Sequence, residues 1–420
     1  MKLRAGSLTY AMVFILIVSL ICFSFYSLFF YSNQSVDAYI DLYKTQLNAR
    51  SGINLLLSRQ NVIKSGEKKT IDLYDNKTDS VELEKNYWGA LEIVSSTALD
   101  KEYRYTLTAL VGNQSLSDTS FALYLADQSN ALVVAGKTEL TGDCYLPQGT
   151  IKTGYINGQP FNGIKPVNGT IKKSPSATLA YNEDLYKYLQ QQFETDSLSK
   201  DSIISLSKQQ LPDTVKNPFS STTITLYSAG VIVLNRTTLS GRIKVFSGKK
   251  IIVKADVNLQ DVVLFAPIIE FENEWKGCVQ AFAHDTLMIG KKCEFSYPSV
   301  LGIIRTKNSA DNPLLKIMEE VKINGDVFAL DEKKDFTKHI SIQTDEKTFI
   351  KGRIYSSDIV DFKGTLYGSI ACTRIIYANS SAVYENHLFN VEVNSNKLPA
   401  WYVGSAVIKQ KSKNGIIKWL

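Results

Sequence analysis

The sequence predicts a mainly β fold: an N-terminal transmembrane α-helix, then a small β-rich region, then a β-helix-like (solenoid) ectodomain. Three observations predict it. No charged residue lies between Ala5 and Val36, short β-favouring runs fill residues 70–135, and a glycine two positions before an aliphatic residue recurs through residues 220–395. With 420 residues, of which 44% are hydrophobic, the chain is long enough for two or three domains.

The apolar run from Ala11 to Phe30 is interrupted only by serines, and its length matches the ~20 residues that cross a bilayer. Lys2 and Arg4 precede it, so the N-terminus is expected in the cytoplasm and the rest of the chain outside. A cleaved signal peptide is the alternative, but the run is longer than usual and lacks a small-residue cleavage site. We expect a single-pass membrane protein with its ectodomain in the periplasm or at the surface of a bacterium.

Helical periodicity continues beyond the apolar run, through residues 35–60. Its apolar residues fall on one face of a helix: Ala38, Leu42, Ala49, Ile53 and Leu56. The pattern predicts one long helix within residues 1–60, half in lipid and half packed on the ectodomain. Gly52 lowers the helix propensity of its second half by roughly 1 kcal/mol relative to Ala.

The segment from Lys2 to Tyr10, with the apolar run and the stretch from Ala49 to Ile53, resembles the start of type IV pilin-like proteins. The likeness is greatest to minor pseudopilins and PilX-like minor pilins. In that family a membrane peptidase cuts after a glycine, and the new N-terminal helix anchors the subunit and packs into a filament. The resemblance implies processing between Gly6 and Ser7. Ala11 stands where the family usually has Glu, which the atypical minor members also lack; an ordinary signal anchor is the alternative.

Residues 61–140 are expected to form a small antiparallel β-rich region that the long helix covers, because turn residues separate their alternating runs. Residues 141–215 combine Gly-led runs with two polar segments, 183–193 and 196–210, that are typical of helices. We interpret them as rungs interrupted by a helical excursion.

Residues 216–395 carry the clearest internal repetition. The Gly-x-aliphatic pattern recurs at Gly241, Gly325, Gly352, Gly364 and Gly368. Brief strands joined by Gly turns predict a β-solenoid, because each coil buries an aliphatic row on the next and Gly permits a tight corner. The spacing is irregular, so a β-sandwich is the alternative. Residues 396–420 are expected to be a C-terminal tail.

Two runs in this region, Ile323 to Ala329 and Ile350 to Ser356, resemble rungs of bactofilins, which are polymer-forming β-helical scaffold proteins. The likeness covers residues 320–378. It implies a β-helical fold far more than it implies polymerisation, because such rungs recur in many parallel β-helices.

Four cysteines follow the apolar run: Cys144, Cys278, Cys293 and Cys372. In an oxidising compartment they can pair in three ways. Cys278 and Cys293 are the candidates for a disulfide, because one coil of a solenoid could bring them together. Four buried free thiols are the alternative.

Few residues could carry chemistry. The three histidines have no metal-binding spacing, and no nucleotide or hydrolase motif is present. His284-Asp285 is expected to face two sides of a strand, and Asp326, Asp358 and Asp361 are expected at a solvated surface instead of forming the facing pair of a glycosidase. We predict no catalytic residue, no metal site and no cofactor.

These observations favour a non-enzymatic structural or assembly protein of the cell envelope, whose solenoid presents a surface to partners. The expected partners are the membrane, envelope or pilus-like assembly proteins, and glycans. Nucleic acid is excluded, because the net charge of +6 comes from 47 basic and 41 acidic residues without a polybasic block. The alternative is an extracytoplasmic carbohydrate-active β-helix enzyme, either a polysaccharide lyase or a glycoside hydrolase.

Overall fold

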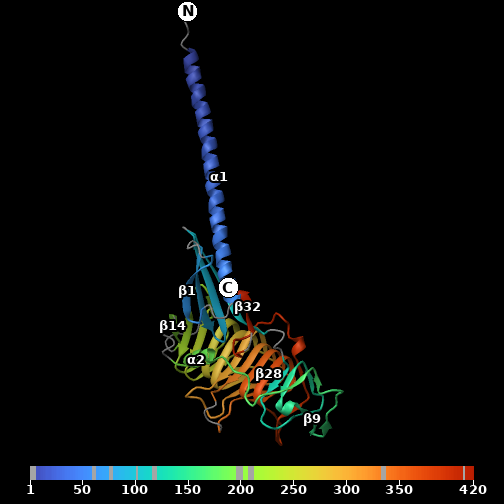
Figure 1. Cartoon of the computed structure of the whole chain (residues 1–420). Helices are drawn as coiled ribbons and strands as arrows, with labels where there is room; N and C mark the ends of the chain where they lie inside the picture. Colours follow the sequence, from blue (N-terminus) through green and yellow to red (C-terminus); the bar gives the residue numbers. More distant parts are fainter. Residues whose placement is uncertain are drawn as a thin grey trace, which may run out of the picture.

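The computed structural model describes residues 6–58, 63–74, 79–100, 103–115, 121–194, 202–206, 212–332, 337–409 and 412–420. A long N-terminal helix rises from a small antiparallel sheet, and a larger body of parallel strands lies beyond that sheet (Figure 1). The fold class expected from the sequence is confirmed: the chain is mainly β, with one long apolar helix at its N-terminal end.

Helix α1 runs without interruption from Gly6 to Ser58, over 53 residues, and is therefore roughly 80 Å long. Its first buried residue is Thr45, so most of its length stands clear of the rest of the molecule (Figure 1). Ala49, Ile53 and Leu56 are buried at its C-terminal end. The expected long helix with an apolar stripe is thus present, but only its C-terminal part, from Thr45 onward, packs on the ectodomain instead of the expected half.

The antiparallel sheet has the strand order β1-β2-β3-β4-β32. Its strands are β1 (Glu67–Asp72), β2 (Ser80–Trp88), β3 (Leu91–Asp100), β4 (Tyr103–Ser115) and β32 (Ser412–Trp419). Ala49 and Ile53 of α1 pack against Leu83 and Val94 of this sheet. A side chain at Gly52 would overlap Ser96 Oγ and come within 2.8 Å of Leu83 Cδ2, so Gly52 permits the close approach of helix and sheet.

Strand β32 corrects one expectation. Residues 396–420 are not a free tail, because β32 pairs antiparallel with β4 along its length. Within β32, Lys418 forms an ion pair with Asp261 of the larger body. In the segment before β32, Tyr402 and Ser405 donate hydrogen bonds to Asp326 of the same body. The C-terminal segment therefore joins the two β parts of the molecule.

The larger body is a solenoid of short parallel strands. Its principal strands in the middle of the chain are β14 (Ser202–Ser205), β15 (Thr214–Asn217), β16 (Ile224–Ser228), β17 (Val231–Leu234), β18 (Thr238–Gly241), β19 (Ile243–Ser247), β20 (Lys250–Val253), β21 (Asn258–Phe271), β22 (Lys276–Ile289), β23 (Glu294–Ile304), β24 (Leu314–Ile317), β25 (Lys322–Leu330), β26 (Ser341–Thr344), β27 (Phe349–Asp361) and β28 (Gly364–Ala378). Strands β16, β17 and β18 pair in parallel with β19, β20 and the start of β21, their counterparts one coil later.

The remaining strands are β5 (Leu123–Leu125), β6 (Leu132–Ala135), β7 (Glu139–Thr141), β8 (Cys144–Leu146), β9 (Ile151–Thr153), β10 (Tyr155–Ile156), β11 (Gln159–Pro160), β12 (Val167–Asn168), β13 (Ile171–Lys173), β29 (Val383–Glu385), β30 (His387–Phe389) and β31 (Val391–Asn394). Strand β5 pairs in parallel with β28, and β8 and then β13 follow it. The early residues 121–173 therefore extend the solenoid past its last coil. The boundary expected at residue 140 is wrong for this reason.

After β13 the chain crosses back along the solenoid and begins the coils at the opposite end, with β14. Helix α2 (Glu183–Gln191) lies on this crossing, and the Asn182 side chain caps it by accepting from the backbone N–H groups of Asp184 and Leu185. The helix expected at 183–193 is thus present. The helix expected at 196–210 is wrong for its described part, because Ser202–Ser205 pairs as a strand with β16; the rest lies outside the described residues.

One row of aliphatic side chains fills the solenoid interior, one residue per coil. Paired in register from coil to coil, the row consists of Leu226, Val245, Leu264, Ala281, Leu301, Val327, Ile354, Ile370, Leu123 and Cys144. All of them are buried in one core cluster. Burying one such side chain contributes about 1.5–3 kcal/mol, so stacking of coils is the main source of stability here.

The next residue in each strand points outward and forms a second row, which is largely aromatic. We name it the aromatic ladder: Tyr227, Phe246, Phe265, Phe282, Gly302, Phe328, Tyr355, Ala371, Tyr124 and Tyr145. Helix α2 covers it with Leu185, Tyr186 and Leu189, and residues 406–408 cover it as well. The ladder face is thus a second core between the solenoid and the elements that pack on it.

Glycine makes one corner of the solenoid possible. An added Cβ at Gly352 would overlap the carbonyl oxygen of Gly325, and one at Gly368 would overlap that of Gly352. These glycines stack in successive coils, with φ near 156°, 156° and 153° at Gly325, Gly352 and Gly368. The recurring Gly-x-aliphatic pattern therefore marks the positions where neighbouring coils approach most closely.

Candidate functional site

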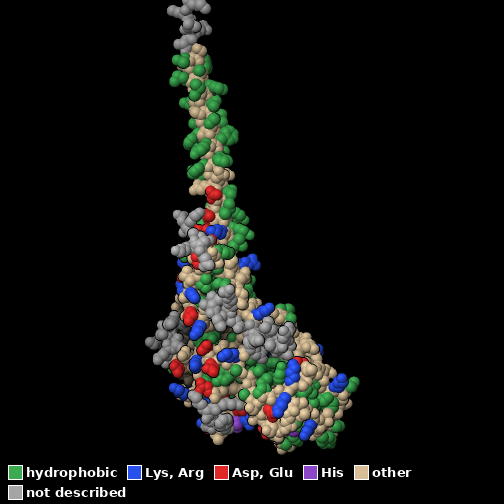
Figure 2. Space-filling model, viewed as in Figure 1, with side chains coloured by type: hydrophobic (Ala, Val, Ile, Leu, Met, Phe, Trp, Pro, Cys, Tyr) green, Lys and Arg blue, Asp and Glu red, His purple; other side chains and the backbone are tan. Residues whose placement is uncertain are grey.

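The most distinctive surface of the molecule is the exposed part of α1. Large apolar side chains from Leu8 to Tyr31 are exposed on the helix, and Figure 2 shows hydrophobic side chains along the length of this part. The most apolar stretch has a mean hydropathy of 2.6 and none of it is buried, so the helix is long and apolar enough to cross a membrane. Contiguous apolar surface of this extent marks a membrane or protein contact.

The residues expected at the processing site lie at the start of this helix. Gly6 is the first residue of α1 and Ser7 is exposed beside it. The basic leader, residues 1–5, lies outside the described residues. Cleavage between Gly6 and Ser7 remains a prediction.

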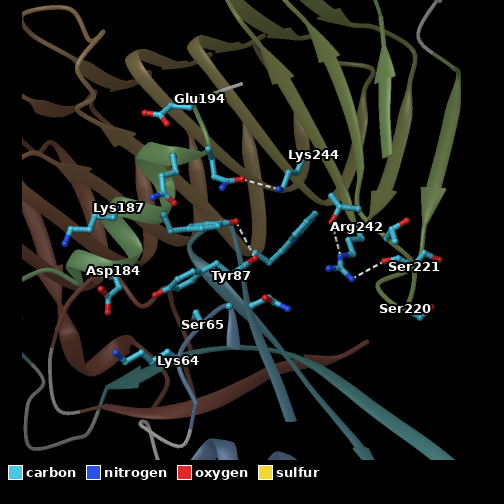
Figure 3. A pocket seen from close by; sticks show the side chains of 18 residues that line it. Lys64, Ser65, Tyr87, Asp184, Lys187, Glu194, Ser220, Ser221, Arg242 and Lys244 are labelled. Carbon is cyan, nitrogen blue, oxygen red and sulfur yellow. Dashed lines mark hydrogen bonds between the residues drawn. The ribbon is translucent and has the colours of Figure 1, made fainter. Parts of the chain in front are cut away.

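A cleft lies where the antiparallel sheet, α2 and the first solenoid coils meet, and we name it the junction cleft (Figure 3). Its volume is about 980 Å³. Its lining residues are Lys64, Ser65, Gly66, Asn86, Tyr87, Trp88, Asp184, Lys187, Tyr188, Gln191, Gln192, Glu194, Ser220, Ser221, Thr222, Thr223, Arg242 and Lys244. Amide, hydroxyl, aromatic and cationic side chains therefore surround one opening.

The solenoid wall of the junction cleft carries a fixed cation. Arg242 Nε donates to Thr223 Oγ1 at 3.1 Å, and its NH1 donates to the carbonyl oxygens of Phe219 and Ser221 at 3.1 and 3.0 Å. Beside it, Lys244 Nζ donates to Gln192 Oε1 at 3.1 Å (Figure 3). These bonds hold the guanidinium plane in place before any ligand arrives.

The sheet and α2 supply the aromatic wall. The rings of Tyr87 and Tyr188 lie with their centroids 4.7 Å apart and an interplanar angle of 31°. Burial, followed by the charge of Glu92, raises the pKa of Tyr87 to about 12, so its hydroxyl stays protonated at neutral pH. Trp88 is buried beneath this wall and donates from Nε1 to the Asp261 carbonyl oxygen at 3.1 Å.

A second cleft, of about 690 Å³, lies at the other end of the crossing segment and includes Tyr181, His339, Asp358 and Arg374. Arg374 donates from Nε and NH2 to Asp358 Oδ1 at 3.1 and 2.9 Å, and His339 Nδ1 lies 3.0 Å from Asp358 Oδ2. Asp358 is thus buried, and its carboxylate oxygens are in contact with Arg374 and His339. This arrangement fixes one corner of the solenoid and holds the Asp358 carboxylate in structural contacts.

The other carboxylates singled out in the sequence are also buried, which corrects the expectation of a solvated surface. Asp326 is 3% exposed and Asp361 is 3% exposed. Burial alone would raise the pKa of Asp326, but the charge of Arg353 and hydrogen bonds from Arg353, Ser405 and Tyr402 hold it below its usual value. Burial, partly offset by Lys363, raises the pKa of Asp361. Both side chains serve the packing of the solenoid.

His284 and Asp285 do not face opposite sides of their strand. Their side chains meet, with Nδ1 3.0 Å from Oδ1, because the register of β22 shifts at this point. The backbone N–H of Ala310 also donates to Asp285. Among the described residues, no group of His, Cys, Asp or Glu side chains is placed to hold a metal ion.

The expected bridge between Cys278 and Cys293 is wrong. Both are free, buried thiols, and they lie on opposite sides of the solenoid wall. Cys293 is in the interior core, whereas Cys278 faces outward toward Trp88 and Leu91. Burial raises the pKa of each thiol to about 11.

The junction cleft itself was not foreseen from the sequence. Its walls come from three elements far apart in the chain, and no spacing of Tyr87, Lys187 and Arg242 signals that they meet. The only hint was the Tyr- and Leu-spaced helix at 183–193, which has a polar face.

No family model matches the chain, and no curated protein matches it. Among solved structures, the chain has a similarity to the crystal structure of the competence-associated pilin ComZ from Thermus thermophilus. The identity is 9%, the alignment covers 86% of this chain and 85% of that chain, and the TM-score is 0.27. Similarity at this level carries no inference about function.

Proposed function

We propose that the chain is a non-enzymatic, membrane-anchored structural subunit of pilin-like design. In this proposal α1 anchors the subunit in the membrane and contacts neighbouring subunits, and the solenoid is the surface offered to envelope partners outside the cytoplasm. The observation that carries the proposal is the division of α1 into an exposed apolar part and a part packed on an antiparallel sheet.

The packed part gives the anchor a mechanical role. Ala49, Ile53 and Leu56 fix the helix to the sheet. The edge strand β32 belongs to that sheet and is joined to the solenoid by the ion pair of Lys418 with Asp261. A helix joined in this way transmits its position in the membrane, or in an assembly of helices, to the whole ectodomain. A signal peptide that is removed, or a flexible tether, would not need such packing.

The proposed orientation follows from charge. Lys2 and Arg4 remain in the cytoplasm, because basic residues are retained on that side, and the β parts lie in the periplasm or at the surface of a bacterial cell. The proposed partners are envelope or pilus-like assembly proteins, together with glycans of the envelope. The rungs that resemble bactofilins support the coil architecture of the presented surface.

The mass of the mature N-terminus tests the pilin-like part of the proposal. We expect the purified chain to begin at Ser7, and a Gly6→Val variant to keep Met1 because its cleavage site is blocked. Gly230→Ala is the control and should be processed normally, because Gly230 is distant and an added Cβ there would make only an ordinary contact with Ser228 Oγ, at 3.8 Å. An unmodified chain that retains Met1 would contradict processing and leave a plain membrane anchor.

A further inference from the structure

We propose that the junction cleft binds an acidic oligosaccharide, a short chain of sugar units that carry carboxylate groups. This inference rests on the proposed function and makes it specific, because it names the class of glycan that the ectodomain recognises. It stands on the size, charge and side-chain chemistry of the cleft.

The size and lining of the cleft suit a short sugar chain. Its 980 Å³ lies at the upper end of the usual range of ~300–1,000 Å³ for small-molecule sites. Sugars present closely spaced hydroxyls that both donate and accept hydrogen bonds, and amide and hydroxyl side chains can do the same. The lining supplies these groups on three sides: Ser65, Asn86, Gln191, Gln192, Ser220, Ser221, Thr222 and Thr223.

The charge of the cleft favours an anion. Four cationic side chains line it, Lys64, Lys187, Arg242 and Lys244, against the two carboxylates of Asp184 and Glu194. Within the described part of the chain, neither Lys64 nor Lys187 has an ion-pair partner. A ligand carboxylate can therefore be bound without breaking an existing pair.

Arg242 is the best-placed of these cations. Three hydrogen bonds from Nε and NH1 fix its guanidinium, and NH2 makes no hydrogen bond to any described residue. A preorganised guanidinium loses little conformational entropy on binding and is well suited to a carboxylate. The NH2 group of Arg242 is thus available to donate to a ligand.

The aromatic wall favours a sugar over an acidic peptide. The half-buried rings of Tyr87 and Tyr188 offer a rigid apolar surface with polar edges, against which the C–H face of a sugar ring can pack. An acidic peptide would use the cations but would leave most of the surrounding amides and hydroxyls without matched partners. The cations of the cleft therefore match the carboxylate of such a ligand, and its tyrosines, amides and hydroxyls match the sugar ring.

The carboxylates of the cleft are not arranged for glycoside hydrolysis. Glycoside hydrolysis requires two carboxylates facing the bond, one of them kept protonated by a buried setting. The carboxylates that line the cleft, Asp184 and Glu194, are both exposed. Asp184 lies in the first turn of α2 and Glu194 beyond its last turn, so the helix separates them.

The test is binding of defined oligomers to the full chain in detergent micelles, measured by isothermal titration calorimetry. The probes are an oligogalacturonate, its methyl-esterified neutral counterpart, and an oligoglutamate of equal charge. We expect the acidic sugar to bind more tightly than both. Lys187→Glu should weaken its binding by about tenfold, because it replaces attraction with repulsion near the ligand carboxylate, whereas Lys249→Glu, an exposed lysine outside the cleft, should not.

Each other outcome overturns the proposal. Equal binding of the neutral ester would show that the cations of the cleft do not select the ligand. Equal binding of oligoglutamate would show that the cleft does not recognise the sugar part of the ligand. Equal weakening by Lys187→Glu and Lys249→Glu would place binding elsewhere, and no binding of any probe would contradict the site. Processing after Gly6 is measured separately, from the mass of the N-terminus. If oligosaccharide binding fails, the proposed role as a pilin-like subunit is therefore still tested by that mass.

Discussion

The guanidinium of Arg353 lies 2.6 Å from the carboxylate of Asp326 on the neighbouring coil, and both side chains are buried. Tyr402 Oη and Ser405 Oγ also donate to Asp326, at 2.8 and 2.7 Å. The pair therefore joins two coils of the solenoid to the C-terminal segment that leads into the antiparallel sheet. It connects the solenoid to the C-terminal segment. Removing the charge of either Asp326 or Arg353 would leave the other as an unpaired buried charge.

Asp326→Asn is expected to lower the free energy of unfolding by about 3–5 kcal/mol, because Arg353 would keep its charge without a counter-ion. Tryptophan fluorescence during urea unfolding measures the change. Glu319→Gln is the control, since its pair with Lys291 is exposed and should be worth less than about 1 kcal/mol. A loss equal to that of the control would contradict the buried joint.

The same pair predicts a pH dependence. The pKa of Asp326 is held below its usual value in the folded state, so its stabilisation is complete above the unfolded pKa of about 3.9 and is lost as the pH falls through the folded pKa. The difference in stability between the wild type and Asp326→Asn should stay constant from neutral pH to about pH 5 and shrink below about pH 4. A difference that persists unchanged in acid would rule out this role for the carboxylate.

Gly352→Ala is expected to prevent normal stacking of the coils, because the added methyl group would overlap the Gly325 carbonyl oxygen. Backbone displacement of this kind costs more than the ~1 kcal/mol that an accommodated Gly→Ala change gains or loses. A large fall in the midpoint of thermal unfolding checks it. Gly230→Ala should leave the midpoint nearly unchanged, because the added Cβ would make only an ordinary contact with Ser228 Oγ, at 3.8 Å.

Gly52→Leu is expected to separate α1 from the sheet, since a side chain there meets Ser96 and Leu83. Limited proteolysis of the detergent-solubilised chain should then cut the C-terminal part of α1, from Thr45 onward, which the wild type protects. Asn54→Leu is the matched control, because Asn54 is exposed on the same helix. Equal protection of both variants would mean that helix and sheet do not pack closely.

Cys278 and Cys293 are expected to be unreactive toward alkylating reagents in the folded protein. Burial raises the pKa of Cys278 and Cys293 to about 11, so at pH 8 almost no thiolate is present to react. In a Cys22→Ser background, peptide mapping should find both positions unmodified by iodoacetamide in the folded chain and modified after denaturation. A disulfide-linked peptide containing the two residues would contradict the structure.

The sequence was sufficient for features that are local in the chain. The charge-free run and the helical stripe predicted α1, and the recurring glycines predicted the coil corners, because each depends on residues close together. Pairing between Leu123 and Ile370 could not be predicted, since nothing in a coil specifies which distant strand will stack on it. The aromatic ladder escaped notice because unequal coil lengths hide the period that places Phe246, Phe265 and Phe282 in one row.

The candidate site was less predictable than the fold. Sequence reasoning searched for paired carboxylates and histidines, and the structure buries Asp326 and Asp358 in contacts that hold the coils together. The junction cleft exists only where the sheet and α2 lie against the solenoid, so its lining residues come from segments far apart in the chain. Its cations and tyrosines therefore form no pattern in the sequence.

The central claim is that α1 crosses a membrane and places the β parts outside the cytoplasm. Labelling of spheroplasts with a membrane-impermeant maleimide tests it most directly, using Lys249→Cys in the exposed solenoid and Leu8→Cys near the start of α1. The account predicts that the cysteine at position 249 is labelled in intact spheroplasts and the one at position 8 only after lysis. Labelling at position 249 only after lysis, or release of the chain as a soluble species, would contradict it.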